Sequence, residues 1–409
     1  MTSAPASRQF HWWTIVLAAA AIAAIGMGLR QVMGLYMKPI TMELGIGRQG
    51  FSLAIAIANL VWGLAAPFVG AISDRYGAGR VGVMGGVMTA LGLYATYAAQ
   101  SEAGLLLAGV FLGLGVAGAG VNAMVGAVAR AAPIEQRTQA IAALGIGSGL
   151  GILIALPYTH LLIEALTWKG SLLALLVTSL AILPLAYVVA GKPRPVQLGP
   201  QASSQSVRVA LHEAFQTPSY YLLNAGFFVC GFHLAFYGTH LPAYVADQGL
   251  SPSVSVMALT AVGAGNLIGT WASGQSARYF PKRYGLSVIY ALRAVVFLGF
   301  LVLPVTPAFV IIASFLLGLL WLSTIPLTSG LVATFFGAQW MTMLYGIVFL
   351  SHQIGSFLGA WSAGLIFDAT KSYDTMWWIS IALGLFAAVV HIPIREEAVL
   401  RPAVAQPAE

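Results

Sequence analysis

The stretch Gly70-Ala-Ile-Ser-Asp74-Arg75-Tyr-Gly77-Ala-Gly-Arg80 is a short, charged, glycine-containing segment between two long apolar runs. Such a segment stands out because the 409-residue chain has only 12 acidic residues and 19 lysines and arginines. We interpret the segment as a cytoplasmic hinge between two membrane helices. The rest of the chain is best explained as two copies of the unit built around this hinge.

The overall composition indicates a membrane protein. Hydrophobic residues make up 59% of the chain, charged residues 8%, and the mean hydropathy is +0.87. Soluble domains carry roughly 25% charged residues, and a soluble protein of this composition would expose large apolar patches. The apolar runs continue over about 20 residues, the length of a membrane-spanning helix. Barrel strands would instead alternate apolar and polar residues over segments of about ten.

The chain has one cysteine, Cys230, which lies inside an apolar run, so an intramolecular disulfide is excluded. We interpret Cys230 as a small buried apolar residue in preference to a reactive thiol. The apolar run that follows the polar start of the chain is too long for the core of a cleaved signal, and we expect it to be retained as a first span.

Twelve membrane spans are predicted, separated into two sets of six by a polar interruption. That interruption, residues 191–217, contains two prolines that flank Arg194 and a Ser/Gln run, which predicts a flexible surface linker. The predicted domains are a six-helix bundle over 1–190, the linker over 191–217, and a six-helix bundle with a tail over 218–409. The spans are 12–36, 50–72, 80–99, 104–129, 139–161, 170–190, 219–245, 254–275, 285–303, 307–331, 342–366 and 375–393.

The distribution of basic residues between alternate loops predicts the orientation. With both termini in the cytoplasm, 13 lysines and arginines fall on the inner side and 4 on the outer side, namely Lys38, Arg48, Lys169 and Lys371. The positive-inside rule therefore favours cytoplasmic termini, in a bacterial-type inner membrane. The net charge of +7 is explained by this topology. A clustered basic face of the kind that binds nucleic acid is absent from the sequence pattern, and no nucleic-acid partner is expected.

A degraded copy of the hinge follows the eighth predicted span. It reads Gly274-Gln-Ser-Ala-Arg278-Tyr-Phe-Pro-Lys282-Arg283, and its first glycine lies 204 positions after Gly70, about half the chain length. A hinge repeated at half-length between matching spans indicates an internal duplication. The two bundles are therefore expected to be related by a pseudo-two-fold axis.

At the hinge the sequence resembles the major facilitator superfamily. The resemblance rests on Gly70, Asp74, Arg75, Gly77 and Arg80, together with the twelve spans, the linker and the half-length repeat. It implies two six-helix bundles around a central cavity, alternating access, and a gating role for these five residues. The carboxylate of the motif is implied to face the start of the span 342–366. The second copy has an arginine where the carboxylate would align, so a symmetrical latch there is doubtful. Simple positive-inside anchoring by the hinge arginines is the alternative.

A narrower resemblance is to the monocarboxylate transporter family and its bacterial relatives. The span 139–161 and the residues before it are similar to a signature of that family at Arg137, Ala140, Gly147, Ser148 and Gly151. Small residues at such spacing also allow close helix packing in any membrane protein. The chain departs from the family where an acid and paired glycines are expected in the first span. It also departs in the eighth span, where an acid and an arginine are replaced near Asn266 and Thr270.

Two arginines, Arg30 and Arg293, lie inside predicted spans, whereas every Asp and Glu falls in a loop, at a helix end or in a tail. An ionisable side chain inside the membrane is costly and indicates function by default, and a guanidinium suits a carboxylate through two parallel hydrogen bonds. We therefore expect Arg30 and its neighbour Gln31 to bind substrate, with an arginine that snorkels to water as the alternative. Arg293 is also a candidate, with a structural arginine bonded to carbonyls, to Tyr290 or to Asn266 as the favoured alternative.

Histidines are the remaining intramembrane side chains that titrate near neutral pH. We predict His233 or His352 as the proton-coupling group, while a hydrogen-bonded structural histidine is the general alternative. His233 and His240 are seven residues apart, a spacing that does not match helical zinc sites, so no metal is expected. Further candidates for the cavity wall, each also compatible with ordinary packing, are Asn59, Trp62, Asn122, Tyr237, Trp321 and Thr324.

These observations predict a secondary transporter, since no phosphate-binding glycine-lysine loop is present to support ATP-driven transport. They do not predict an enzyme. The predicted substrate is a small organic anion of the monocarboxylate class, moved by proton symport or anion exchange. Efflux of amphipathic drugs or natural products is the alternative, and a non-transporting receptor or scaffold is a third. The expected partners are the organic anion, protons and the lipid bilayer, with no cofactor, and the chain is expected to act as a monomer.

Overall fold

The computed structural model describes residues 11–133, 136–190, 207–337 and 341–399, and within these ranges the regular structure is entirely helical. The predicted all-α architecture is therefore confirmed. The helices are α1 (Trp12–Gln31), η1 (Val32–Tyr36), α2 (Met37–Leu44), α3 (Arg48–Tyr76), α4 (Ala78–Ala98), α5 (Glu102–Ala119), α6 (Val121–Ala131), α7 (Arg137–Leu180), α8 (Ile182–Val189), α9 (Val207–Gln216), α10 (Pro218–Asp247), α11 (Pro252–Ser276), α12 (Lys282–Val302), α13 (Pro307–Leu320), α14 (Thr324–Phe336), α15 (Met341–Thr370) and α16 (Asp374–His391).

Local sequence signals explain where several helices begin. Pro218, Pro252 and Pro307 each occupy the first helical position, where a missing N–H costs nothing. The side chains of Ser101 and Thr306 accept hydrogen bonds from backbone N–H groups two or three positions into α5 and α13. The apolar runs between these signals then form helices because lipid leaves the backbone no other partner.

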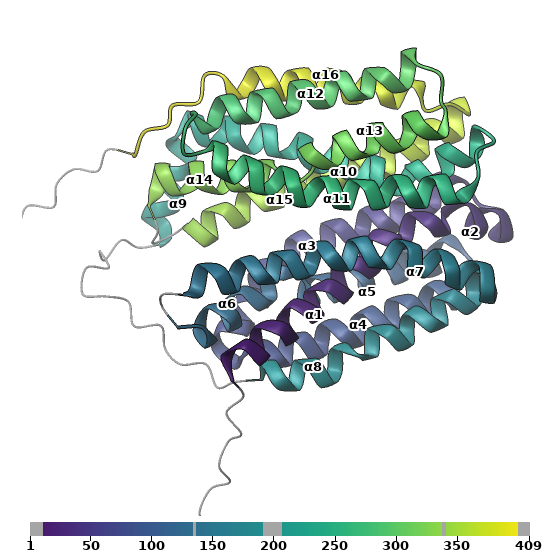
Figure 1. Cartoon of the computed structure of the whole chain (residues 1–409), viewed down its shortest axis with the longest axis horizontal. Coiled ribbons are helices and arrows are strands. Elements are labelled where there is room, and N and C mark those ends of the chain that lie inside the picture. The colour runs from purple at the N-terminus through teal and green to yellow at the C-terminus, as the bar shows by residue number, and fades with distance from the viewer. Residues whose placement is uncertain (1–10, 134–135, 191–206, 338–340, 400–409) are drawn as a thin grey trace, which may run out of the picture.

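Eleven segments of the described chain are long and apolar enough to cross a membrane. One of them, Gln139–Val189, has 51 residues, more than twice the roughly 20 residues that a single crossing needs. It bends at Thr167, whose φ and ψ of 67° and 169° are non-helical, so it makes two crossings. The chain thus crosses twelve times, as predicted. α1 begins and α16 ends at the same end of the molecule (Figure 1).

The helices gather in two halves, α1–α8 and α9–α16 (Figure 1). Within the halves the main packing pairs are α1 with α7, α4 with α5, α10 with α15, and α12 with α16. Between the halves α3 packs on α15, and α7 packs on α11. Gly151, a glycine of the family signature, allows α7 to pack closely on α1, since a Cβ there would lie 2.1 Å from the carbonyl oxygen of Ala24. The exact bounds of two independent bundles stay a prediction.

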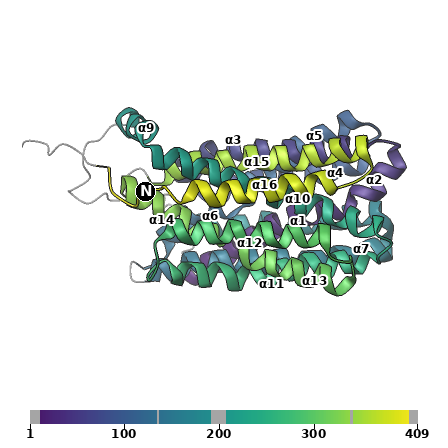
Figure 2. The same cartoon turned by 90° about the horizontal axis from the view of Figure 1, so that it is seen from above.

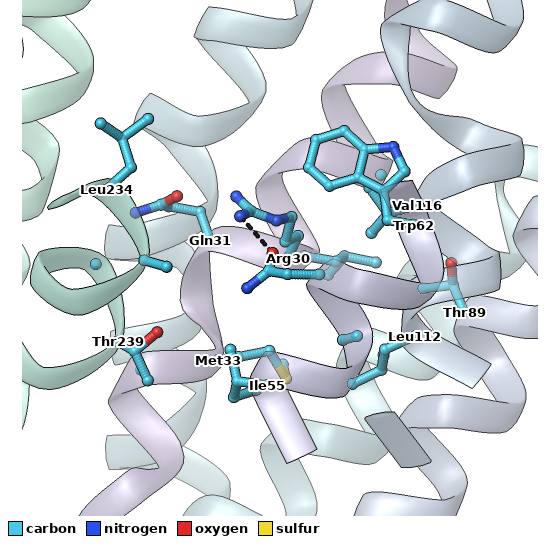
Figure 3. Close-up of a pocket in the computed structure, with 17 residues that line it drawn as sticks. Arg30, Gln31, Met33, Ile55, Trp62, Thr89, Leu112, Val116, Leu234 and Thr239 are labelled. Atoms are coloured by element: carbon cyan, nitrogen blue, oxygen red, sulfur yellow. Dashed lines mark hydrogen bonds between the residues drawn. The ribbon is translucent and has the colours of Figure 1, made fainter. Parts of the chain in front are cut away.

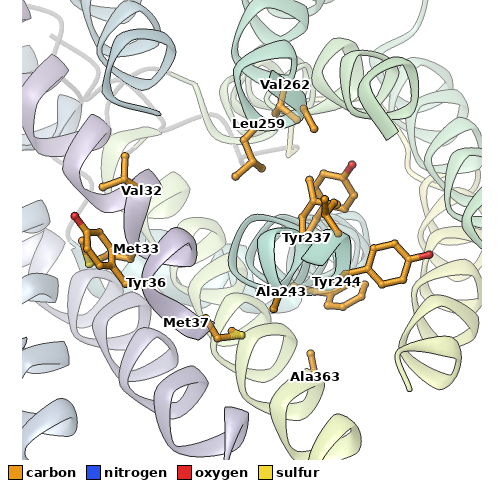
Figure 4. Packing of buried hydrophobic residues seen from close by; sticks show 14 of the residues in the cluster. Val32, Met33, Tyr36, Met37, Tyr237, Ala243, Tyr244, Leu259, Val262 and Ala363 are labelled. Atoms are coloured by element: carbon orange, nitrogen blue, oxygen red, sulfur yellow. The ribbon is translucent and has the colours of Figure 1, made fainter. Parts of the chain in front are cut away.

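The largest buried apolar cluster spans both halves of the molecule. It contains Val32, Met33, Tyr36 and Met37 from the end of the first crossing and continues through α10 (Figure 4). This packing buries the end of the first crossing against the second half of the chain. The two halves are therefore in direct apolar contact at this depth.

The predicted linker 191–217 differs from the structure in its last third. Residues Val207–Gln216 form the helix α9, which lies beyond the ends of the long helices (Figures 1 and 2). Ala214 of α9 is fully buried in an apolar cluster with residues of α10 and α14, which explains why this part is ordered as a helix. Residues 191–206 lie outside the described part.

The hinge motif forms a tighter connection than the predicted turn. α3 continues helically to Tyr76, and a single residue, Gly77 with φ of 94°, joins it to α4. Only glycine adopts such a φ without strain, so the motif needs this residue for the reversal. The guanidinium groups of Arg75 and Arg80 lie 5.3 and 5.9 Å from the ring centre of Tyr76. The side chain of Asp74 lies outside the described part, so its predicted contacts are not addressed.

Candidate functional site

A cavity of about 50 Å³ lies between the two halves, near the end of α1. Helices α1, α3, α4 and α5 form its walls from the first half, and α10 closes it from the second half (Figure 3). Its polar lining residues are Arg30, Gln31, Asn59, Thr89 and Thr239. Two residues predicted as substrate ligands, Arg30 and Gln31, and the two further candidates Asn59 and Trp62 are thus brought together in one place.

Arg30 is held in position by two neighbours on α3. Its Nη2 donates a hydrogen bond of 2.8 Å to Oδ1 of Asn59, drawn as the dashed line in Figure 3. The indole of Trp62 covers the guanidinium, whose Cζ lies 5.0 Å from the ring centre. One nitrogen is thus anchored by a neutral amide and one face by an aromatic ring. A fixed guanidinium of this kind can bind a carboxylate at its remaining N–H groups.

The guanidinium of Arg30 brings a positive charge to the cavity, and no carboxylate of the lining balances it. None of its lining residues is Asp or Glu, and no ion pair of Arg30 occurs within the described part of the chain. The second half contributes Leu234, Ala235, Gly238 and Thr239 to the lining. Figure 3 shows Leu234 and Thr239 on a ribbon that faces Arg30. A water needs roughly 10–15 Å³ on this volume measure, so the enclosed space suits a ligand of only a few non-hydrogen atoms.

One end of the molecule, which we name the Arg48 end after its central residue, is closed by an ionic network between the halves. Arg48 of α3 donates two hydrogen bonds, of 2.6 and 2.8 Å, to the two carboxylate oxygens of Asp247 at the end of α10. Lys38 lies 2.8 Å from the same carboxylate. Asp368 of α15 accepts hydrogen bonds from the backbone N–H groups of Arg48 and Gln49, at the positive N-terminus of α3.

A backbone crossing lies between this network and the cavity. A Cβ on Gly34 of η1 would lie 2.6 Å from the carbonyl oxygen of Gly238 on α10, closer than real Cβ atoms approach. The two backbones therefore touch at this point. The cavity is shut on the Arg48 side by main-chain packing as well as by charge.

At the opposite end, which we name the Arg75 end, the same helices separate. On α3 and α15, a Cβ at Gly63 would lie 2.6 Å from Gln353, and one at Gly364 would lie 2.8 Å from the backbone oxygen of Arg48. Further along these helices, Gly70 and Gly346 face open space, with no described atom within 4 Å of a built Cβ. Gly145 of α7 and Gly274 of α11 face open space in the same way. The halves thus touch at the Arg48 end and diverge toward the Arg75 end.

The other predicted cavity residues of the second half lie apart from the cavity. Tyr237 is buried, its hydroxyl is 2.7 Å from the Ser314 hydroxyl on α13, and it projects away from the Val32–Met37 stretch (Figure 4). Trp321 packs edge-on to Tyr237, with ring centres 6.1 Å apart. Thr324 is buried, with its hydroxyl 3.4 Å from Sγ of Cys230. In the first half, Asn122 is exposed on α6 and is not among the cavity's lining residues.

Arg293 lies among backbone carbonyls, as in the structural alternative to a substrate ligand that the sequence favoured. It is 1% exposed, and its Nε and Nη2 donate hydrogen bonds to the carbonyl oxygens of Leu320 and Trp321. These carbonyls belong to the break between α13 and α14. Oδ1 of Asn266 accepts a hydrogen bond of 3.1 Å from the backbone N–H of Leu322 in the same break. Arg293 therefore stabilises an interrupted helix and does not reach the cavity of Arg30.

The two histidines predicted for proton coupling have different surroundings. His233 is buried against Phe297, and its Nε2 is 2.9 Å from the carbonyl oxygen of Ser380 within the second half. His352 of α15 is buried at the contact between the halves, with Nδ1 2.9 Å from Oε1 of Gln353. Of the two, only His352 lies beside a residue that bonds the cavity wall, because Nε2 of Gln353 donates to the Asn59 carbonyl oxygen.

Sequence reasoning missed the ionic network at the Arg48 end. Lys38 and Arg48 entered only as outer basic residues, and Asp247 and Asp368 as acids at helix ends. The only available signal was the pairing of opposite charges at span ends on one side of the membrane. Such charges are far apart in sequence, so the pattern does not indicate which of them meet.

Comparisons with known proteins agree with this architecture. A model of the Major Facilitator Superfamily matches residues 15–360. Monocarboxylate transporter 11 of Mus musculus is 26% identical over 417 residues, which cover 96% of this chain and 90% of that protein. The uncharacterized MFS-type transporter YcxA of Bacillus subtilis is 24% identical, with 96% and 97% covered. The hexuronate transporter of Bacillus subtilis is 25% identical, with 90% and 87% covered.

Among solved structures, the chain is similar to a bacterial homolog of the human lysosomal transporter Spinster in an inward-facing and occupied conformation. The TM-score is 0.70, the sequence identity is 13%, and 95% of each chain is covered. At this identity the likeness concerns the fold alone.

Proposed function

Because the chain belongs to the major facilitator superfamily, and is thus a membrane transporter of small substrates and not an enzyme, we propose that it carries a small organic anion of the monocarboxylate class. The observation that supports this proposal is the guanidinium of Arg30. It is fixed by Asn59 and Trp62, faces the cavity and has no acid among the lining residues. A carboxylate that binds there replaces the missing counter-charge.

Two further observations agree with a carboxylate. Relatives at low identity are named monocarboxylate transporters and a hexuronate transporter, and both names denote carboxylates. The enclosed volume of about 50 Å³ suits a small ligand, whereas drug-sized molecules occupy pockets of roughly 300–1,000 Å³. Efflux of amphipathic drugs is therefore less well supported than transport of a small anion.

The positive-inside distribution supports the orientation in which the Arg75 end is cytoplasmic, in the inner membrane, with both termini on that side. The ionic network of Arg48 and Asp247 is then the outer gate, and the chain is closed to the outside and open toward the cytoplasm. Charge balance supports proton symport or anion exchange, because no described carboxylate lies in the middle of a span to titrate with the substrate.

The test is uptake into proteoliposomes of labelled acetate, lactate, pyruvate and glucuronate, with and without a pH gradient. Wild-type protein should accumulate at least one of these anions. Arg30→Ala should lower its uptake by about tenfold or more, because a hydrogen bond to a charged group contributes roughly 1.5–3 kcal/mol. Normal uptake by Arg30→Ala would refute the anion site. Thr41→Ala, a change near the Arg48 end outside the cavity lining, controls for general damage.

A further inference from the structure

We propose that Gln353 is a positioning residue that couples proton binding at His352, in the second half, to anion binding at Arg30, in the first half. This coupling rests on the anion site proposed above and specifies how that site is linked to a proton. Gln353 is fully buried at the contact between α3 and α15. It is the side chain through which His352 reaches the wall of the cavity.

A chain of three hydrogen bonds joins the two sites. Nδ1 of His352 lies 2.9 Å from Oε1 of Gln353. Nε2 of Gln353 donates a hydrogen bond of 3.0 Å to the backbone oxygen of Asn59. The Asn59 side chain in turn accepts the 2.8 Å hydrogen bond from Arg30. Asn59 thus bonds Arg30 with its side chain and Gln353 with its backbone, so it takes part in both sites.

These contacts also determine which nitrogen of His352 carries a hydrogen. A carbonyl oxygen only accepts, so the bond to Asn59 must come from the amide N–H of Gln353, and Oε1 is left as the acceptor. Nδ1 of His352 must then carry a hydrogen and donate it to Oε1. In the neutral ring the lone pair is then on Nε2, where the coupling proton binds.

A second, aromatic connection runs beside the polar one. The ring of Phe349 stacks parallel to His352, with an interplanar angle of 7° and ring centres 5.9 Å apart. Phe349 also meets Trp62 edge-on, with ring centres 5.1 Å apart. Trp62 covers the guanidinium of Arg30. His352 is thus joined to both groups that hold Arg30 in position, Asn59 and Trp62.

The titratable groups around His352 come from α10, α12 and α15. From α10 it faces the thiol of Cys230, which Arg293 and Tyr290 of α12 also approach, and Tyr345 of α15 lies near the same thiol. The ionisable residues of α3 and α16 are at the ends of those helices, and α14 has none.

No carboxylate of the described chain lies among these groups, so an anion bound at Arg30 supplies the negative charge that this region lacks. By linkage, the bound anion and a proton on His352 then strengthen each other's binding by the same factor. Proton and anion therefore bind together, which is the requirement for symport.

The test compares two transport modes in proteoliposomes, using whichever of acetate, lactate, pyruvate and glucuronate the wild type takes up best. Gln353→Met keeps the side-chain volume but neither hydrogen bond. It should lower uptake driven by a pH gradient by about tenfold, while counterflow exchange at equal pH falls by less than about threefold. Ser351→Ala is the matched control on α15, because Ser351 bonds only backbone oxygens of the second half.

A second variant separates coupling from structure. In Gln353→Glu a carboxylate lies next to His352 and favours the protonated ring, so the pH of half-maximal uptake should rise by about one unit. A merely structural role of Gln353 would leave that pH unchanged. Equal losses of gradient-driven uptake and counterflow in Gln353→Met would overturn the coupling, as would wild-type uptake that ignores the pH gradient. Absence of any carboxylate uptake by the wild type would instead overturn the anion site itself.

Discussion

Two arginines lie in the membrane-spanning part of this chain, and their neighbours give them different tasks. Arg30 is anchored through one nitrogen to Asn59 and faces a cavity. Arg293 is buried and donates to the carbonyl oxygens of Leu320 and Trp321. The first therefore has N–H groups that face the cavity, whereas the second directs its Nε and Nη2 to the carbonyls of an interrupted helix. Composition and spacing alone do not distinguish these two cases.

This difference predicts that Arg293 matters for stability. Arg293→Met removes the donors to two buried carbonyls, and each such charged hydrogen bond contributes roughly 1.5–3 kcal/mol. We expect the apparent Tm of the purified protein in detergent to fall by roughly 5–10 °C. Arg278→Met, a change at an exposed arginine in the turn between α11 and α12, should leave the Tm nearly unchanged. An Arg293→Met protein as stable as the wild type would show that the carbonyls of the break need no donor.

At the scale of elements, the contact between α3 and α15 determines which end of the molecule is open. These helices touch at Gly364 and Gly63 and separate at Gly70 and Gly346. The closed end is reinforced by Asp247, which binds Arg48 and Lys38 together. Opening that end requires all of these inter-half bonds to break, so their strength sets the population of the state that is open at the Arg48 end.

In the proposed orientation the Arg48 end faces outward, and neutralising Asp247 should open it. In Asp247→Asn, the ion pairs with Arg48 and Lys38 are lost, which should raise the outward-open population by about tenfold. The readout is labelling of Thr239→Cys in the cavity wall by a membrane-impermeant maleimide added outside, in a Cys230→Ser background. Labelling should become several-fold faster than in the parent.

The control for this experiment is Asp374→Asn. Asp374 lies at the same end of the molecule, in the first turn of α16, and makes no ion pair within the described residues. Its neutralisation should leave the labelling rate unchanged. If Asp247→Asn and Asp374→Asn label at the same rate, then the ionic network does not hold the gate closed.

At the scale of the whole molecule, the fold could be predicted from the sequence but the second half's site residues could not. Twelve apolar runs, a hinge and its half-length copy contain the information for twelve crossings, since each is a local pattern. Arg30 was also predictable, because an intramembrane arginine is unusual in itself. The prediction of Tyr237, Trp321 and Thr324 assumed that their helices face the cavity. In the structure these three side chains are buried and contact residues of their own half.

The contributions of the two halves to the cavity are therefore unequal. The first half supplies Arg30, Gln31, Asn59, Trp62 and Thr89, whereas the second half supplies a largely apolar wall with Thr239. In the proposed function, the first half recognises the charge of the substrate and the second half closes over it. Such a division explains why a connection such as Gln353 is needed for the second half to respond to binding.

The central claim is that the cavity recognises the charge of a carboxylate through Arg30. The most direct measurement is isothermal titration of purified protein with lactate and with lactamide, its uncharged amide of nearly the same shape. The account predicts that wild-type protein binds lactate at least about tenfold more tightly than lactamide, and that Arg30→Ala loses this preference. Equal affinity of the wild type for both compounds, or a preference for lactate that survives in Arg30→Ala, would contradict it.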